Sequence, residues 1–113
     1  MLNTNLSHLA TEEDVSRAIK ENAAVMICCG RMGPMCIPVY RAMEKLENSY
    51  PRVAFRDIDF DSPAADCIKD LDECAAFMTL PFTVYYKEGK VAAATSGIQS
   101  EKEITDRLER YFQ

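Results

Sequence analysis

The segment CCGRMGPMCIPVY, residues 28–40, gathers sulfur-containing side chains around a Gly-Pro turn. It holds three of the five cysteines and two of the six methionines of the chain. A cysteine thiolate attacks and forms disulfides and binds metals, whereas a methionine thioether has no proton to lose and forms no disulfide. Any thiol chemistry in this segment therefore depends on where its three cysteines lie relative to the turn.

Cys36 follows the turn directly and is the leading candidate nucleophile. Apolar residues recur at helical spacing after it, which predicts a helix from about Ile37 to Ser49. Pro38 is tolerated in the first turn of that helix, where its missing N–H has no partner to lose. Cys36 then lies at the N-cap or within one residue of it, where backbone N–H groups and the helix dipole stabilise a thiolate. The alternative is a small buried side chain at the start of the helix.

Cys29 is the candidate partner of Cys36. The continuous apolar run AAVMICC, residues 23–29, predicts a central strand covered on both faces. Neighbouring side chains in a strand point to opposite faces of the sheet, so only one of Cys28 and Cys29 can face Cys36 as its partner. The six-residue loop GRMGPM contains two glycines and a proline that allow a tight return, so Cys29 could face Cys36 and resolve a mixed disulfide. The other interpretation is two core cysteines without a partner.

The same sulfur atoms suggest a third chemistry. Cys29, Met32, Met35 and Cys36 offer two thiols and two thioethers, which are soft ligands of the kind that select Cu(I). Their spacing matches no known copper motif, and methionine also fills gaps in cores and partner-binding surfaces. We therefore predict no bound metal and no other cofactor, and keep Cu(I) binding as the last of three hypotheses.

Composition limits the classes of partner. A chain of 113 residues suffices for a single core, so we expect one domain over residues 1–113. The net charge of −5 and the scattered basic residues argue against nucleic acid or an anionic membrane, and favour a protein or small-molecule partner. The odd number of cysteines suits a reducing compartment, and no signal sequence or membrane span is recognisable. A cytoplasmic protein is the expectation.

The rest of the chain alternates strand and helix signals. Strands are expected at residues 6–10, 23–29 and 52–60, and helices at about 11–22, 37–49 and from 63 onward. Capping signatures begin the first and last helices, with Thr11 before Asp14 and Ser100 before Glu103. Residues 81–97 predict a hairpin, and a helix follows it. The order is β-α-β-α-β-α-β-β-α.

This order resembles the thioredoxin fold, an α/β fold with a central mixed sheet flanked by helices, over nearly the whole chain. Three segments carry the resemblance: VMICCGRMGPMC resembles the strand and active-site loop of that family, LPFTVYYKEGKVAAATSG its cis-proline and hairpin segment, and SEKEITDRLERYF its last helix. Family members use a first cysteine as nucleophile and a second to resolve the mixed disulfide. The resemblance thus implies thiol-disulfide exchange where those cysteines are kept.

The cysteines of the family motif are not in their usual places here. Without gaps, Arg31 falls where the family has tryptophan, and Met32 and Met35 fall where it has its two cysteines. Met26 falls at the place of a buried acid that assists proton transfer in many thioredoxins. If the loop holds one extra residue, Cys36 takes the place of the second cysteine. Any remaining chemistry must then run through Cys36, with Cys29 as the candidate partner.

Pro81 and Leu80 carry a second implication of the resemblance. Pro81 matches the cis-proline that faces the loop, and the backbone of Leu80 would pair with an extended partner peptide. Met32 and Met35 would line an apolar groove beside them. Two functions follow. The first is a thiol-redox protein that acts through Cys36 and is served by a thiol reductase, and the second is a non-catalytic binding or chaperone-like module that keeps only the groove.

Three other groups of residues are expected to be structural. Cys67, Cys74 and Met78 lie on one apolar stripe of the third helix, so core packing is favoured, although animal thioredoxins carry a similar regulatory cysteine pair. An intact helix would separate the two cysteines by about 10 Å, beyond disulfide length. His8 is expected to be a hydrogen-bonded edge or core histidine, and the acidic run at residues 57–61 a solvated strand end.

Overall fold

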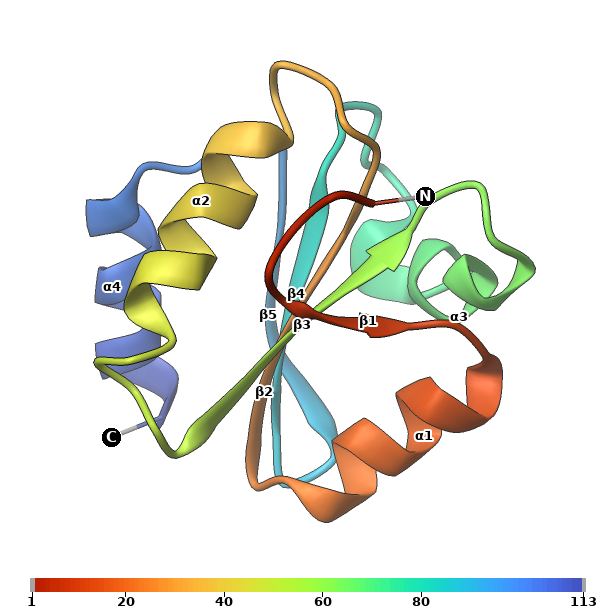
Figure 1. Ribbon diagram of the computed structural model, residues 1–113. Coiled ribbons are helices and arrows are strands. Elements are labelled where there is room, and N and C mark those ends of the chain that lie inside the picture. Colours follow the sequence, from red (N-terminus) through yellow and green to blue (C-terminus); the bar gives the residue numbers. More distant parts are fainter. Residues whose placement is uncertain (1, 113) are drawn as a thin grey trace.

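The computed structural model describes residues 2–112 (Figure 1). The strands and α-helices follow in the order β1 (Ser7–Leu9), α1 (Glu12–Glu21), β2 (Ala24–Gly30), α2 (Ile37–Leu46), β3 (Val53–Asp59), α3 (Asp66–Lys69), β4 (Phe82–Lys87), β5 (Lys90–Ser96) and α4 (Glu101–Phe112). Two short 3₁₀ turns flank α3, at Pro63–Ala65 and Asp72–Cys74. Within residues 2–112 no helix has the length and apolar character needed to cross a membrane.

The strands form one mixed sheet in the order β1-β3-β2-β4-β5. β1 and β2 run parallel to β3, whereas β4 runs antiparallel to both β2 and β5. Helices α2 and α4 cover one face of the sheet, and α1 and α3 cover the other (Figure 1). The central strand β2 therefore runs between two helical layers and leads directly into the loop before α2.

β2 is buried over its whole length, as its continuous apolar run predicts. Its alternate side chains enter two separate cores. Met26 and Cys28 pack toward α2 and α4, whereas Val25, Ile27 and Cys29 pack toward α1 and α3. The two neighbouring cysteines are thus separated by the sheet itself.

The predicted helix starts are confirmed. Thr11 and Asp14 form a reciprocal capping box at α1, and the backbone amides and side chains of Ser100 and Glu103 exchange hydrogen bonds at α4. α2 begins where the sequence predicts and ends earlier than expected, at Leu46. Local capping chemistry therefore fixes the start of these helices better than periodicity fixes their ends.

The prediction of a long third helix is wrong. α3 has only four residues, and Leu71 is extended (φ −64°, ψ 140°) before the second 3₁₀ turn. Ile68 and Cys74 are the buried side chains on either side of this break. A helix with 3.6 residues per turn does not place positions six residues apart on one face, so the break lets both enter the core. It also leaves Met78 95% exposed instead of in an apolar stripe.

Asp57 is not the solvated acid that the sequence predicts. Its side chain is fully buried in β3, opposite Cys28 of β2. One carboxylate oxygen lies 2.6 Å from Nδ1 of His8, and the Thr4 hydroxyl donates to the other. Burial raises the pKa of Asp57 in spite of these contacts. The contacts fix the N-terminal segment against β3, and His8 is the hydrogen-bonded edge histidine that the sequence favours.

Candidate functional site

Three loops meet at the end of the sheet where β2 finishes (Figure 1): residues 31–36 before α2, residues 75–81 before β4, and residues 97–100 before α4. The peptide bond between Leu80 and Pro81 is cis. The Gly97 amide donates to the carbonyl oxygens of both Thr79 and Pro81, each at 3.0 Å, which joins the second and third loops. Pro81 in turn contacts Gly30 at the end of β2, which brings the first loop to the other two.

Gly30 is the point of closest approach in this assembly of loops. A Cβ atom at this position would lie 2.8 Å from the Tyr40 hydroxyl oxygen, 2.9 Å from Cys36 Sγ and 3.1 Å from Pro81 Cβ. Side chains do not sustain contacts below 3.0 Å of this kind. The absence of a side chain at residue 30 therefore allows the start of α2 and Pro81 to pack against β2.

Cys36 lies at the N-cap of α2, and its thiol is buried. Its exposed fraction is 2%, and Gly30 and Tyr40 lie beside it. The carbonyl oxygen of Gly33 accepts from the amides of Cys36 (3.1 Å) and Ile37 (3.0 Å), so the chain turns tightly before the helix. The Cys36 side chain caps no backbone amide. Of the two predictions made for this residue, the structure shows the small buried side chain at a helix start.

Cys29 and Cys36 are not brought together. Cys29 packs toward α1 and α3, whereas Cys36 packs toward α2 and α4 on the other face of the sheet. Cys28 is the cysteine of β2 that shares a face with Cys36. All five cysteines are free. Of the two interpretations given for Cys29, the structure therefore matches the core cysteine without a partner, because strand alternation separates the two cysteines of β2 but does not say which one faces α2.

Burial keeps the thiols of β2 protonated. It raises the pKa of Cys29 to about 12 and the pKa of Cys28 well above its ordinary value. The Thr83 hydroxyl, which donates to Cys28 Sγ at 3.9 Å, opposes only part of this rise. Burial also raises the pKa of Tyr40, whose hydroxyl has no hydrogen-bond partner among the residues that the structure describes. Because the thiolate is the nucleophile, Cys28 and Cys29 are poor nucleophiles at neutral pH.

Each of the three loops exposes one large apolar side chain. Among residues 2–112 the exposed large hydrophobic side chains are Met35 (40%), Met78 (95%) and Ile98 (48%), and each belongs to a different loop. We call these three residues the apolar rim. Met32, predicted to line a groove with Met35, is half-buried, and its sulfur accepts a hydrogen bond from the Asn3 amide at 3.4 Å. Only Met35 of the two loop methionines therefore faces solvent strongly.

Two members of the apolar rim were missed by reasoning from the sequence. The helical pattern predicts that Met78 lies in a buried stripe, and the break at Leu71 removes that stripe. No pattern in the sequence predicts a role for Ile98. It lies in the short connection between the end of β5 at Ser96 and the start of α4 at Glu101. A residue there belongs neither to a strand face nor to a helix face that could bury it. The signal for its exposure is its position: it is an apolar residue in a connection next to a turn glycine and a helix cap.

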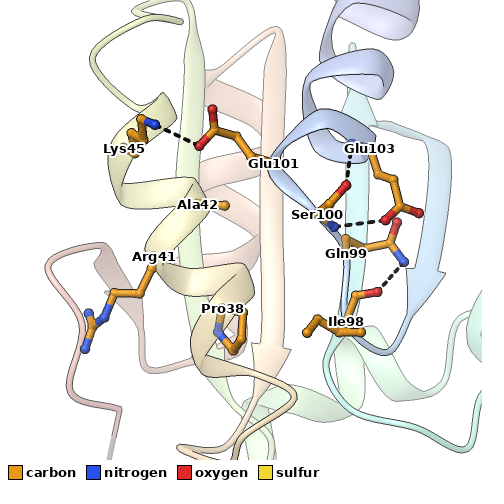
Figure 2. A pocket seen from close by; sticks show the side chains of 9 residues that line it. All are labelled: Pro38, Arg41, Ala42, Lys45, Ile98, Gln99, Ser100, Glu101 and Glu103. Carbon is orange, nitrogen blue, oxygen red and sulfur yellow. Dashed lines mark hydrogen bonds and ion pairs between the residues drawn. The ribbon is translucent and has the colours of Figure 1, made fainter.

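A groove of about 480 Å³ lies between α2 and the start of α4 (Figure 2). Pro38 and Ile98 lie at one end, and the ion pair between Lys45 and Glu101, with a nitrogen–oxygen distance of 3.2 Å, lies at the other (Figure 2). The remaining lining residues are Arg41, Ala42, Gln99, Ser100 and Glu103. Ile98 belongs to both the groove and the apolar rim.

No metal centre is preformed in the described part of the chain. Residues 2–112 contain no cluster of three or more His, Cys, Asp or Glu side chains that could hold a metal ion. The four sulfur atoms considered for Cu(I) are also dispersed, since Cys29 and Cys36 are buried in different cores and Met35 is exposed.

No protein-family model matches the chain, and no curated protein sequence matches it. Solved structures do. Thioredoxin from Fasciola hepatica has a TM-score of 0.78 at 22% identity, with 94% of this chain and 99% of that chain covered. The oxidized form of mitochondrial thioredoxin 3 from Saccharomyces cerevisiae has a TM-score of 0.76 at 22% identity, with 93% of this chain and 94% of that chain covered. Oxidized thioredoxin O2 from Arabidopsis thaliana has a TM-score of 0.77 at 16% identity, with 99% of this chain and 98% of that chain covered. The predicted thioredoxin fold is confirmed.

Replacing Gly30 by alanine tests whether the close approach at the end of β2 holds the loops together. The new Cβ would meet Tyr40, Cys36 and Pro81 at 2.8–3.1 Å. We expect Gly30→Ala to lower the free energy of unfolding by about 1–3 kcal/mol in urea denaturation. Gly33→Ala is the matched control, because nothing lies within 4 Å of a Cβ there. Equal losses in the two variants would contradict the proposed constraint.

Burial of the thiols predicts their order of reaction with dithiobis(nitrobenzoate). In the native protein at pH 8, the half-exposed Cys67 should react first and the four buried thiols more slowly, because the reaction needs an accessible thiolate. The fast phase should vanish in Cys67→Ser and survive in Cys36→Ser, and urea should release all five thiols together. A fast phase that is lost in Cys36→Ser would instead show that the Cys36 thiol is accessible.

Proposed function

We propose that this protein uses the thioredoxin fold to bind an extended apolar segment of another protein at the apolar rim, by a mechanism that needs no thiol. One observation carries the proposal. The exposed large hydrophobic side chains of the described chain lie one on each of the three loops at this end of the sheet, while Cys36 is 2% exposed. Covering such side chains with a partner is favourable by about 25 cal/mol for each Å² of apolar surface removed from water.

The backbone of Leu80 supplies the polar part of this binding surface. The carbonyl groups of its neighbours Thr79 and Pro81 accept from the Gly97 amide. In the part of the chain that the structure describes, neither the amide nor the carbonyl of Leu80 takes part in such a backbone hydrogen bond. An extended peptide pairs with free main-chain groups of this kind, and side-chain contacts add specificity. The half-buried Leu80 and the apolar rim would provide those contacts.

Two pairs of charged side chains lie beside the loops or the groove. Arg31 makes two hydrogen bonds to the carboxylate of Asp61, at 2.7 Å and 2.9 Å, and Lys45 pairs with Glu101 beside the groove. Exposed pairs of this kind contribute little free energy to binding. We infer that the partner segment is selected by its apolar side chains and its extended shape rather than by its charge.

Thiol-disulfide exchange through Cys36 is the second candidate function. It is supported by the N-cap position of Cys36, where backbone amides favour a thiolate, and by the likeness of the fold to thioredoxins. The thiolate would attack one sulfur of a partner disulfide and release the other as a thiolate, and a dithiol reductase would then resolve the mixed disulfide. The low exposure of Cys36 requires residues 31–36 to open before this step.

Binding of an unfolded chain without thiols separates the two functions. Reduced, carboxymethylated lactalbumin is a suitable probe, because all of its thiols are blocked. We expect the wild-type protein to bind it and the double variant Met35→Gln/Ile98→Gln to bind about tenfold more weakly, since two apolar contacts become polar. Biolayer interferometry measures both affinities.

Two controls accompany this measurement. Val91→Thr replaces a half-buried apolar residue at the other end of β5 and should leave binding unchanged. Binding should also persist in Cys36→Ser. Full binding by the double variant of the apolar rim would contradict the proposal, and complete loss in Cys36→Ser would favour thiol exchange instead.

A further inference from the structure

The sulfur atoms that face solvent in this protein are those of methionine more than those of cysteine. Met78 is 95% exposed and Met35 is 40% exposed, whereas the cysteines of the loop region, Cys28, Cys29 and Cys36, are all buried. An oxidant that diffuses to the three loops therefore meets thioether sulfur before it meets a thiol.

We infer that Met35 and Met78 form an oxidative modification site, at which peroxides convert thioethers to sulfoxides and weaken binding of apolar segments at the apolar rim. The inference rests on the proposed function and adds a mode of regulation to the same surface. It assigns hydrogen peroxide or an organic peroxide as the reactant class. It gives the protein a response to oxidants that uses none of its cysteines.

The reaction needs only the thioether and the peroxide. A lone pair of the methionine sulfur attacks one oxygen of hydrogen peroxide, the O–O bond breaks and an S–O bond forms. The sulfur loses two electrons, and the second peroxide oxygen leaves as water after it takes the remaining proton. One sulfoxide and one water molecule are therefore produced from one thioether and one hydrogen peroxide, and an organic hydroperoxide yields the corresponding alcohol in place of water.

Oxidation changes the chemical character of the apolar rim. The sulfoxide oxygen is a strong hydrogen-bond acceptor, so two of the three side chains of the apolar rim would become polar. Burying such a group against an apolar segment costs free energy unless the segment supplies a donor. Ile98 has no oxidisable group and would remain the one apolar contact. Affinity for apolar segments should therefore fall without loss of the fold.

The other methionines of the described chain provide internal comparisons. Met26 and Met43 are fully buried in the core that α2 and α4 cover. Met32 is half-buried, and the hydrogen bond from the Asn3 amide engages one lone pair of its sulfur. Exposure therefore predicts that Met78 is oxidised first, Met35 next and Met32 later, with Met26 and Met43 last.

Cys67 is the thiol that could compete for the oxidant. It is half-exposed, unlike the other four cysteines. Burial raises the pKa of the Cys67 thiol, which lowers its thiolate fraction, but its accessibility still requires a control. The Cys67→Ser variant removes this competitor and lies outside the apolar rim, so it is the background for the test.

The first part of the test maps the modification. The Cys67→Ser protein is treated with increasing concentrations of hydrogen peroxide and then digested. The mass of each methionine-containing peptide is measured by mass spectrometry. Sulfoxide should accumulate at Met78 and Met35 at doses that leave Met26 and Met43 reduced. Equal oxidation of the exposed and the buried methionines, or resistance of Met35 and Met78, would overturn the inference.

The second part measures the consequence for binding. Selectively oxidised protein should bind carboxymethylated lactalbumin about tenfold more weakly than untreated protein. Methionine sulfoxide reductase with dithiothreitol should restore binding, since it returns the sulfoxide to the thioether. The variant Met35→Leu/Met78→Leu should have the same affinity before and after peroxide, whatever that affinity is. Unchanged binding by the oxidised protein, or an equal loss in the leucine variant, would overturn the inference.

A dye separates failure of this inference from failure of the proposed function. If untreated protein does not bind lactalbumin, the proposed function fails, and fluorescence of anilinonaphthalenesulfonate then reports on the apolar rim directly. A loss of dye fluorescence after selective oxidation, absent in the leucine variant, would support a surface made polar by sulfoxides. Unchanged fluorescence would overturn the inference independently of any protein partner.

Discussion

The close packing around Gly30 is the constraint on which the site depends. Three atoms, two of them in Cys36 and Tyr40 at the start of α2 and one in Pro81, lie within 2.8–3.1 Å of the place where a Cβ atom of residue 30 would be. This contact seats the first turn of α2 and Pro81 against the end of the central strand, and the Gly97 amide then ties the third loop to the second. The same packing that assembles the three loops also covers the Cys36 thiol. Assembly of the apolar surface and burial of the thiol are therefore two results of one arrangement.

Much of the fold could be predicted from the sequence, because the responsible signals are local. The seven buried residues of β2, the capping boxes and the hairpin each follow from a short pattern. The errors concern choices that only tertiary packing makes. Residues 63–81 carry a helical pattern, yet the core takes Ile68 and Cys74, so the helix breaks between them. Asp57 is typical of a solvated strand end, yet its β-register places it beside His8.

The sequence places the candidate site at the loop before α2 and at Pro81, but it does not show how the side chains there pack. The positions of Cys36 and Pro81 in the loops followed from the resemblance, whereas the burial of Cys36 and the face of Cys29 depend on side-chain packing that sequence does not display. The structure buries the thiols of Cys28, Cys29 and Cys36 and exposes the thioethers of Met35 and Met78. A surface of this kind suits reversible contact with apolar chains, because methionine is flexible and polarisable and adapts to different partners.

The central claim is that an extended apolar chain binds at the three loops without a thiol. The most direct test is two-dimensional NMR of the ¹⁵N-labelled protein titrated with carboxymethylated lactalbumin. We predict that the amide shifts that change belong to residues 31–36, 78–81 and 97–99. Shift changes confined to other surfaces, or seen only when the probe carries a free thiol or a disulfide, would contradict the account.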